Sequence, residues 1–319
     1  MARILKDWEN RIGRQLKLRD LHILSVVVQQ GGMAKAAKPL SMTQPAISDS
    51  IANLEDTLGA RLLDRTSKGV QPTIYATALL KRGLVVFDEL KKAIEDIEFL
   101  ADPAVGEVRI GCPESLSAGL VPAIIDRLSR RHPKIAVHVV DAQPAATGFR
   151  ELRDREVDLL LGRRFEPFSD DEVKMEVLGQ DRFVVVVGTG NRFARRKTMS
   201  LQELMEESWI LYPTDNVIGA FIVEAFCKQG LQPPRKAVTT FSLHIRMHLL
   251  ATGRFVTIMQ ESILRYNAKH WALKALPIKL SIPSVPLASF SLSSRTLSPA
   301  VDRFLEHTRE LMKSSTKTP

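Results

Sequence analysis

The sequence is poor in cysteine and lacks long apolar runs. Only two of its 319 residues are cysteines, Cys112 and Cys227, and their spacing fits neither a zinc site nor a disulfide framework. Charged residues recur every few positions at the N-terminus, and no run of about 18 apolar residues occurs, so a signal peptide and a membrane-spanning helix are not expected. These absences predict a soluble, cytoplasmic protein without membrane contact.

Common catalytic motifs are missing as well. The sequence has no HExxH, GxSxG, GxGxxG or phosphate-loop pattern. Cys112 has no histidine near it in local spacing and is interpreted as a small buried apolar residue. His244 and His248 are one helical turn apart and can share a metal ion, but no third ligand is in sequence reach, so a structural role is the favoured interpretation. We expect no enzymatic activity, cofactor or metal.

Basic residues outnumber acidic ones. The chain has 45 Lys and Arg against 36 Asp and Glu, a net charge of +9. Residues 1–75 hold 11 Lys and Arg against 7 Asp and Glu, so the excess is not confined to one end. This balance favours a polyanionic partner without identifying one.

Two short helices joined by a tight turn are predicted near the N-terminus. Apolar residues follow a helical period over 18–31, which ends at a Gly-Gly pair, and a second helix fits 33–40. Thr43 is a suitable N-cap and Pro45 lies in the first turn of a third helix, which stops at Gly59. This is a helix-turn-helix pattern.

A hairpin and a long helix follow. Residues 60–73 combine apolar pairs, a charged tip and a glycine turn, as expected for a β-hairpin wing. The predicted helix over 74–101 carries apolar residues at steps of three and four, which indicates a dimer-forming coiled coil. These seam residues are Leu80, Phe87, Leu90, Ile94 and Ile97.

The remainder predicts an α/β fold. Strands are expected at 106–112, 135–140, 157–161 and 182–187, with helices at 115–132 and 147–155 among them and a closing helix at 299–313. Such alternation indicates a largely parallel sheet.

The ordered motif between Ala36 and Arg65 resembles the DNA-binding signature of the LysR family of transcriptional regulators. It comprises Ala36-Ala37, Gln44-Pro45-Ala46-Ile47-Ser48, Ile51, Leu54-Glu55, Leu58-Gly59 and Leu62-Leu63-Asp64-Arg65. The resemblance implies a winged helix-turn-helix in 1–75, with 1–17 as an extension, and a linker and dimerisation helix in 76–103. It further implies a regulatory domain in 104–313, built like the periplasmic binding proteins from two α/β subdomains, I (104–180 and 283–313) and II (181–282).

The resemblance assigns DNA contacts to the third helix and the wing. The candidates are Thr43, Gln44, Pro45, Ser48, Asp49, Arg65 and Lys68. An amide such as that of Gln44 can pair in bidentate fashion with adenine, and an arginine at the wing can reach phosphate or the minor groove. Asp49 departs from the family, in which a basic residue is common there.

The same resemblance places a small-molecule effector of unknown identity in the cleft between subdomains. Helix N-termini favour anions or hydroxyls in such a cleft. The candidates are Ser115, Leu116, Ser117, Thr214, Asp215, Ser242, Gln260 and Ser262. Arg163 and Arg164 either bind a carboxylate effector or pair with Glu166 or Asp154.

The partners implied are double-stranded promoter DNA, a second copy of the chain in a homodimer that assembles as a dimer of dimers, and RNA polymerase. The alternative is a solute-binding protein of similar α/β fold without a gene-regulatory role. That alternative leaves residues 34–101 without an explanation.

Overall fold

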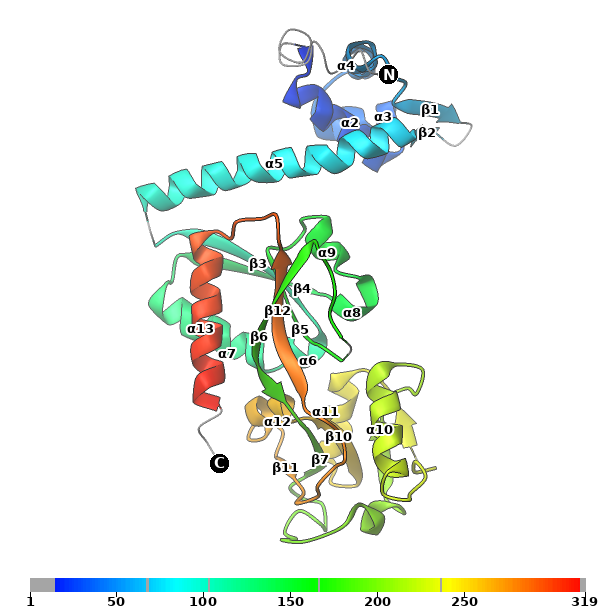
Figure 1. Ribbon diagram of the computed structural model, residues 1–319, viewed down its shortest axis with the longest axis vertical. Coiled ribbons are helices and arrows are strands. Elements are labelled where there is room, and N and C mark those ends of the chain that lie inside the picture. The colour runs from blue at the N-terminus through cyan, green and yellow to red at the C-terminus, as the bar shows by residue number, and fades with distance from the viewer. Residues whose placement is uncertain (1–14, 67–68, 103, 166, 236, 316–319) are drawn as a thin grey trace. The chain divides into compact units, whose positions relative to one another are not determined.

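The computed structural model describes residues 15–66, 69–102, 104–165, 167–235 and 237–315. The chain forms two compact units, Met1–Ile94 and Glu95–Pro319, and α5 runs from the first into the second (Figure 1). Lys68 and the N-terminal extension up to residue 14 lie outside the described residues.

The first unit is a winged helix-turn-helix. Its elements are α2 (Leu18–Gln30), α3 (Met33–Leu40), α4 (Gln44–Leu58), β1 (Leu63–Thr66), β2 (Gly69–Pro72) and the start of α5 (Ile74–Ala101). The predicted helix boundaries are confirmed: the Thr43 hydroxyl accepts a hydrogen bond from the Ala46 N–H at 3.4 Å, and α4 ends at Gly59 with φ 63°. Ile47, Ile51 and Leu54 form the buried face of α4.

The wing depends on a glycine. β1 and β2 pair antiparallel from Leu63 opposite Pro72 to Thr66 opposite Gly69, and the Val70 N–H donates to the Gly31 carbonyl at 3.1 Å. Gly69 has φ 124°, and a Cβ there would lie 2.4 Å from the Gly31 oxygen. A side chain at position 69 would therefore push the hairpin away from the end of α2.

The predicted seam of α5 divides into two parts. Leu80 is half-buried against the core of the first unit, and the half-buried Phe87 meets the His22 ring edge-on at 6.1 Å. Leu90, Ile94 and Ile97 are instead 44%, 58% and 66% exposed. The first part serves the domain's own packing, whereas the second leaves an apolar stripe uncovered.

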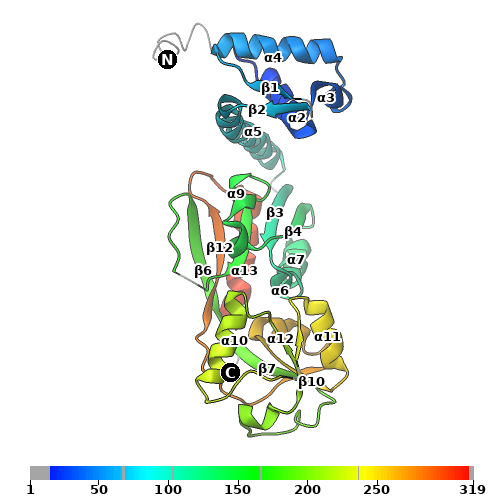
Figure 2. The same ribbon diagram turned by 90° about the vertical axis from the view of Figure 1, so that its right-hand side faces the viewer.

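The second unit contains two five-stranded sheets (Figure 2). The first has the order β4-β3-β5-β12-β6 and the second β11-β7-β10-β8-β9. The strands are β3 (Gly106–Cys112), β4 (Ile135–Asp141), β5 (Leu159–Arg163), β6 (Val173–Asp181), β7 (Phe183–Gly188), β8 (Ser208–Leu211), β9 (Ala237–Thr239), β10 (Phe255–Gln260), β11 (Leu273–Ala275) and β12 (Val285–Leu292).

Helices cover both faces of each sheet. The helices are α6 (Glu114–Ser117), α7 (Leu120–Arg131), α8 (Pro144–Thr147), α9 (Arg150–Arg153), η3 (Leu201–Leu204), α10 (Val217–Cys227), α11 (Leu243–Ala251), α12 (Glu261–Asn267) and α13 (Pro299–Ser315). One core joins the first sheet to α7 and α13, and another lies on the side of α9. In the second sheet, η3 and α10 share one core while α11 and α12 share the other.

The sheets are more antiparallel than the expected largely parallel arrangement. In the first, β3 pairs parallel with β4 and β5, but β12 pairs antiparallel with both β5 and β6. Strands β6 and β12 were not anticipated from the sequence. They lead the chain out to the second sheet and back, and the outgoing and returning strands must run in opposite directions (Figure 1).

Two expected helices are broken. The helix expected over 115–132 is interrupted at Ala118 and Gly119 between α6 and α7. The break frees the Ala118 carbonyl, which accepts a hydrogen bond from Asn267 Nδ2 at 2.9 Å. The helix expected over 147–155 is replaced by the single turns α8 and α9, separated by Gly148 and Phe149 with φ 59° and 61°.

Candidate nucleic-acid and effector sites

The outer face of α4 presents exposed polar side chains. Thr43, Gln44, Pro45 and Asp49 are exposed, and Ser48 is half-buried. Gln44 makes no side-chain hydrogen bond to the described part of the chain. The four exposed side chains are therefore accessible to an external partner, while the opposite face of the helix anchors it in the core.

Glu55 fixes the wing to this helix. One of its carboxylate oxygens accepts hydrogen bonds from the Leu62 and Leu63 N–H groups at 2.6 and 3.1 Å. The sequence motif contains Glu55, but its role was not inferred. At the other end of β1, Arg65 pairs with Val70 through the backbone. The placement of the Arg65 side chain and of Lys68 is not part of the described structure.

A buried polar cluster joins the two sheets of the second unit. Arg163, at the end of β5, has a side chain only 3% exposed and donates from Nε to Asp181 Oδ2 at 2.8 Å. Its Nη1 donates to Ser115 Oγ and its Nη2 to Ser262 Oγ, both at 2.8 Å. Two predicted effector residues, 147 positions apart in the chain, are thereby held by one guanidinium.

Asp181 completes this cluster. Besides pairing with Arg163, it accepts hydrogen bonds from the Ser262 N–H at 3.0 Å and from Ser262 Oγ at 2.6 Å. Of the two partners considered from the sequence, Asp154 lies near Arg150 instead, at 4.0 Å, and Glu166 lies outside the described residues. Asp181 ends a strand that the sequence did not reveal, so local spacing gave no signal for the pair.

A second acidic residue links the sheets at the N-terminus of α11. Glu114 Oε2 accepts a hydrogen bond from the Leu243 N–H at 3.1 Å, and the Ser242 hydroxyl accepts one from the Ile245 N–H at 3.4 Å. A carboxylate at this position interacts favourably with the partial positive charge of the helix end. An internal acid thus occupies a position where the sequence suggested an anionic ligand.

The other predicted effector residues do not join one cluster. Leu116 is buried and the Ser117 hydroxyl donates to the Glu114 carbonyl. Gln260 is buried and accepts a hydrogen bond from the Tyr212 hydroxyl at 3.4 Å. Thr214 and Asp215 are exposed.

Arg246 is a buried residue that sequence reasoning missed. It is fully buried in α11, and its guanidinium lies 3.9 Å from the centre of the Tyr212 ring. Nη1 donates to Thr257 Oγ1 at 2.6 Å and Nη2 to the Thr240 carbonyl at 2.8 Å. Both acceptors are neutral, and Nε has no hydrogen-bond partner among the described residues. Aromatic stacking and neutral acceptors therefore replace the usual counter-ion.

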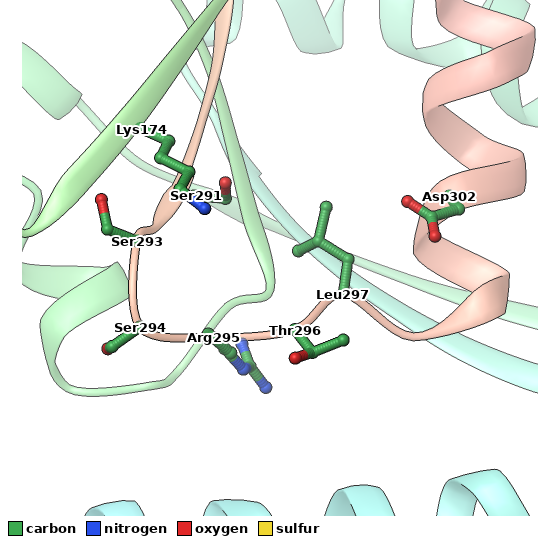
Figure 3. Close-up of a pocket in the computed structure, with 8 residues that line it drawn as sticks. All are labelled: Lys174, Ser291, Ser293, Ser294, Arg295, Thr296, Leu297 and Asp302. Atoms are coloured by element: carbon green, nitrogen blue, oxygen red, sulfur yellow. The ribbon is translucent and has the colours of Figure 1, made fainter.

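A separate hollow of about 480 Å³ lies at the far end of β6 and β12 (Figure 3). Its lining combines four hydroxyl-bearing residues with three charged ones and a leucine: Lys174, Ser291, Ser293, Ser294, Arg295, Thr296, Leu297 and Asp302. Burial raises the pKa of Asp302, against the opposing effect of Arg309. Because Leu292 pairs with Val173 and Val285 with Asp181, this hollow is at the opposite strand ends from the Arg163 cluster.

Cys112 carries no sign of nucleophilic chemistry. Its side chain is fully buried, and burial, with a smaller contribution from the Asp141 charge, raises the pKa of the thiol to about 12. A thiol with such a pKa remains protonated at neutral pH and behaves as a small apolar residue.

Comparison with known proteins decides the family. Residues 18–77 match the bacterial regulatory helix-turn-helix of the LysR family, and residues 101–313 match the LysR substrate binding domain. The chain belongs to the LysR family. It is a DNA-binding transcriptional regulator with an effector-binding domain, and the alternative of a solute-binding protein does not account for the match at 18–77.

The similarity to known regulators extends over nearly the whole chain. The regulator is 26% identical to GbpR of Azospirillum brasilense, over 89% of this chain and 83% of that one. It is also 26% identical to the dual regulator GltC of Bacillus subtilis (strain 168), over 91% and 96%.

Two solved structures share its fold. A full-length OxyR variant from Pseudomonas aeruginosa has a TM-score of 0.63 at 19% identity, covering 93% of this chain and 95% of its own. Full-length CbnR in complex with its target DNA also has a TM-score of 0.63, at 20% identity and 92% and 99% coverage. None of the helices in the described part of the chain combines the length and the apolar character that a membrane span requires.

Proposed function

We propose that this regulator reads promoter DNA with α4 and the wing, and that a small effector bound between the two α/β subdomains changes that activity. The observation that carries the proposal is the Arg163 cluster, in which Ser115 of the first subdomain and Ser262 of the second share one buried guanidinium. A ligand that reorganises these hydrogen bonds changes how the subdomains are held. It regulates only if it binds the two arrangements with different affinity.

The DNA contacts are assigned to Thr43, Gln44, Pro45, Ser48 and Asp49 on α4. The accessibility of the first three and the absence of an internal hydrogen bond from Gln44 support this assignment. We extend it to Arg65 and Lys68 of the wing, which would contact phosphate or the minor groove.

The effector we propose is neutral and hydroxyl-bearing. Asp181 already neutralises Arg163, and Glu114 already occupies the Leu243 N–H at the end of α11. A carboxylate ligand would have to displace these internal acids, whereas a hydroxyl can add to Ser115 and Glu114 without removing a charge. The proposed contacts are completed by Ser117, Thr214, Asp215, Ser242, Gln260 and Ser262, with Leu116 beneath them.

The assembly we propose is a homodimer through the exposed stripe of α5, paired into a dimer of dimers. Leu90, Ile94 and Ile97 support it, because an uncovered apolar stripe at helical spacing is suited to a second copy. In this proposal the regulator acts on RNA polymerase from the promoter and catalyses no reaction of its own.

One experiment can both identify the effector and test its site. The full chain is screened by thermal shift against neutral polyols and their matched acids, since a ligand of the native state raises the melting temperature. Ser115→Ala should reduce the shift caused by the true effector. Ser129→Ala, a substitution in α7 of a serine that bonds only within its own helix, is the control. Equal shifts in the two variants contradict the role of Ser115.

A further inference from the structure

Helix α11 carries two exposed histidines that face each other. His244 and His248 are one turn apart, and their Nε2 atoms are 3.3 Å from each other. The Trp271 ring lies edge-on to both, at 6.2 and 5.0 Å between centroids. The rings are therefore held in place by a third side chain and are open to solvent.

The separation of the two nitrogens matches a shared metal ion. Histidine nitrogens bind Zn²⁺ at about 2.0–2.1 Å, and two such bonds spanning 3.3 Å enclose an angle of about 105–110° at the metal. This is the angle of tetrahedral coordination. A pair at i and i+4 on one helical face is also the spacing used by histidine ligands of helical zinc sites.

We propose that His244 and His248 form a binding site for a divalent transition metal ion of the Cu²⁺, Ni²⁺ or Zn²⁺ class. Imidazole nitrogens suit these ions, whereas Mg²⁺ and Ca²⁺ prefer oxygen ligands. In the part of the chain that the structure describes, no group of three or more His, Cys, Asp and Glu surrounds a common point. Solvent therefore completes the coordination, and the ion exchanges readily.

Metal binding at His244 and His248 would stiffen helix α11. Both histidines lie on α11, whose first N–H is bonded to Glu114 on α6. A metal ion that joins positions i and i+4 stiffens the turn that follows this contact. The inference is independent of the proposed effector and of DNA binding, because metal binding is measured without either.

The test is a calorimetric titration of the full chain, prepared without a histidine tag, with Cu²⁺, Ni²⁺ and Zn²⁺. We expect a binding event that is tightest for Cu²⁺, as the order of divalent affinities requires, and that Mg²⁺ does not produce. Electron paramagnetic resonance of the bound Cu²⁺ should show two nitrogen ligands.

The variants decide whether the two histidines are the ligands. His244→Asn and His248→Asn should each weaken binding by at least the roughly 10- to 100-fold that loss of a supporting residue costs a metal site. His138→Asn, which removes an exposed histidine of β4, should leave the affinity unchanged. Both rings are exposed, so the variants should fold. Absence of binding in the wild type, or equal affinity in all four proteins, overturns the proposal.

Discussion

The α4 face and the Arg163 cluster use polar side chains in opposite ways. At the start of α4, the polar groups of Gln44 and Asp49 are exposed, while the exposed Thr43 hydroxyl caps the helix by accepting from the Ala46 N–H. In the cluster, all three guanidinium nitrogens of Arg163 and both oxygens of Asp181 bond to other side-chain or backbone groups. A surface that binds a large external polyanion can leave its groups to water, whereas a buried charge must be satisfied from within.

The difference shows what each region is ready to do. In the proposed DNA complex the exposed side chains of α4 gain their contacts from the partner, so their substitution should affect binding and leave stability nearly unchanged. The cluster already holds the subdomains, so its substitutions should affect stability first.

Removal of Asp181 should have the largest effect. Asp181→Ala leaves the guanidinium of Arg163 buried without its counter-ion, which costs about 3–5 kcal/mol of unfolding free energy. Urea unfolding of the full chain measures it. Glu176→Ala, which breaks the partly exposed pair with Arg309, should cost no more than about 1 kcal/mol. A similar small loss in both variants would mean that the cluster is not the buried charge pair described here.

The exposed stripe of α5 comes next. Ile97→Glu should dissociate the dimer, because each copy loses about 2 kcal/mol of apolar burial and gains a charge in the seam. Sedimentation velocity measures the mass. Ile74→Glu, at an exposed isoleucine outside the stripe, is the control. Phe87→Glu is a poorer test, since Phe87 also contacts His22. An unchanged mass for Ile97→Glu would exclude this stripe as the dimer contact.

Loss of the Gln44 amide should weaken binding without affecting the fold. Gln44→Ala is expected to reduce operator affinity by about 1–3 kcal/mol and relax selectivity at one base pair. A fluorescence anisotropy titration at fixed salt measures this, with the unfolding free energy measured in parallel. Gln202→Ala, an exposed glutamine of η3, should change neither quantity. Unaltered operator affinity for Gln44→Ala would remove Gln44 from the interface.

The N-terminal unit could be predicted nearly to the residue. Its helices are set by local signals, such as the Thr43 cap and the Gly59 stop, which act over a few positions. The role of Glu55 was missed because its partners, the Leu62 and Leu63 N–H groups, become available only once the chain has turned into the wing.

For the second unit the sequence predicted the α/β fold class, but not the full set of strands or their pairing. Strands β6 and β12 pair with each other although about a hundred residues separate them, and no local period marks such a pairing. Glu114 and Leu243 are 129 positions apart. Arg163 and Asp181 are only 18 positions apart, but Asp181 ends the unanticipated strand β6. Ser115 and Ser262 were identified because each begins or adjoins a helix, which is a local signal. The hydrogen-bond partners of their hydroxyls, by contrast, are determined by the tertiary structure.

Substitution of Glu114 should have the smallest effect, and it tests whether the N–H groups at the start of α11 are already hydrogen-bonded within the protein. Glu114→Gln keeps a hydrogen-bond acceptor near the Leu243 N–H but removes the charge, so only the interaction with the helix end is lost, about 0.3–1 kcal/mol. Hydrogen exchange of the Leu243 amide should become faster by the corresponding few-fold. Glu172→Gln, an exposed acid of the first subdomain paired with Arg153, should leave that amide unchanged. Unaltered exchange in Glu114→Gln would show that the end of α11 is open, as the α4 face is, and would return it to the set of positions available to an anionic effector.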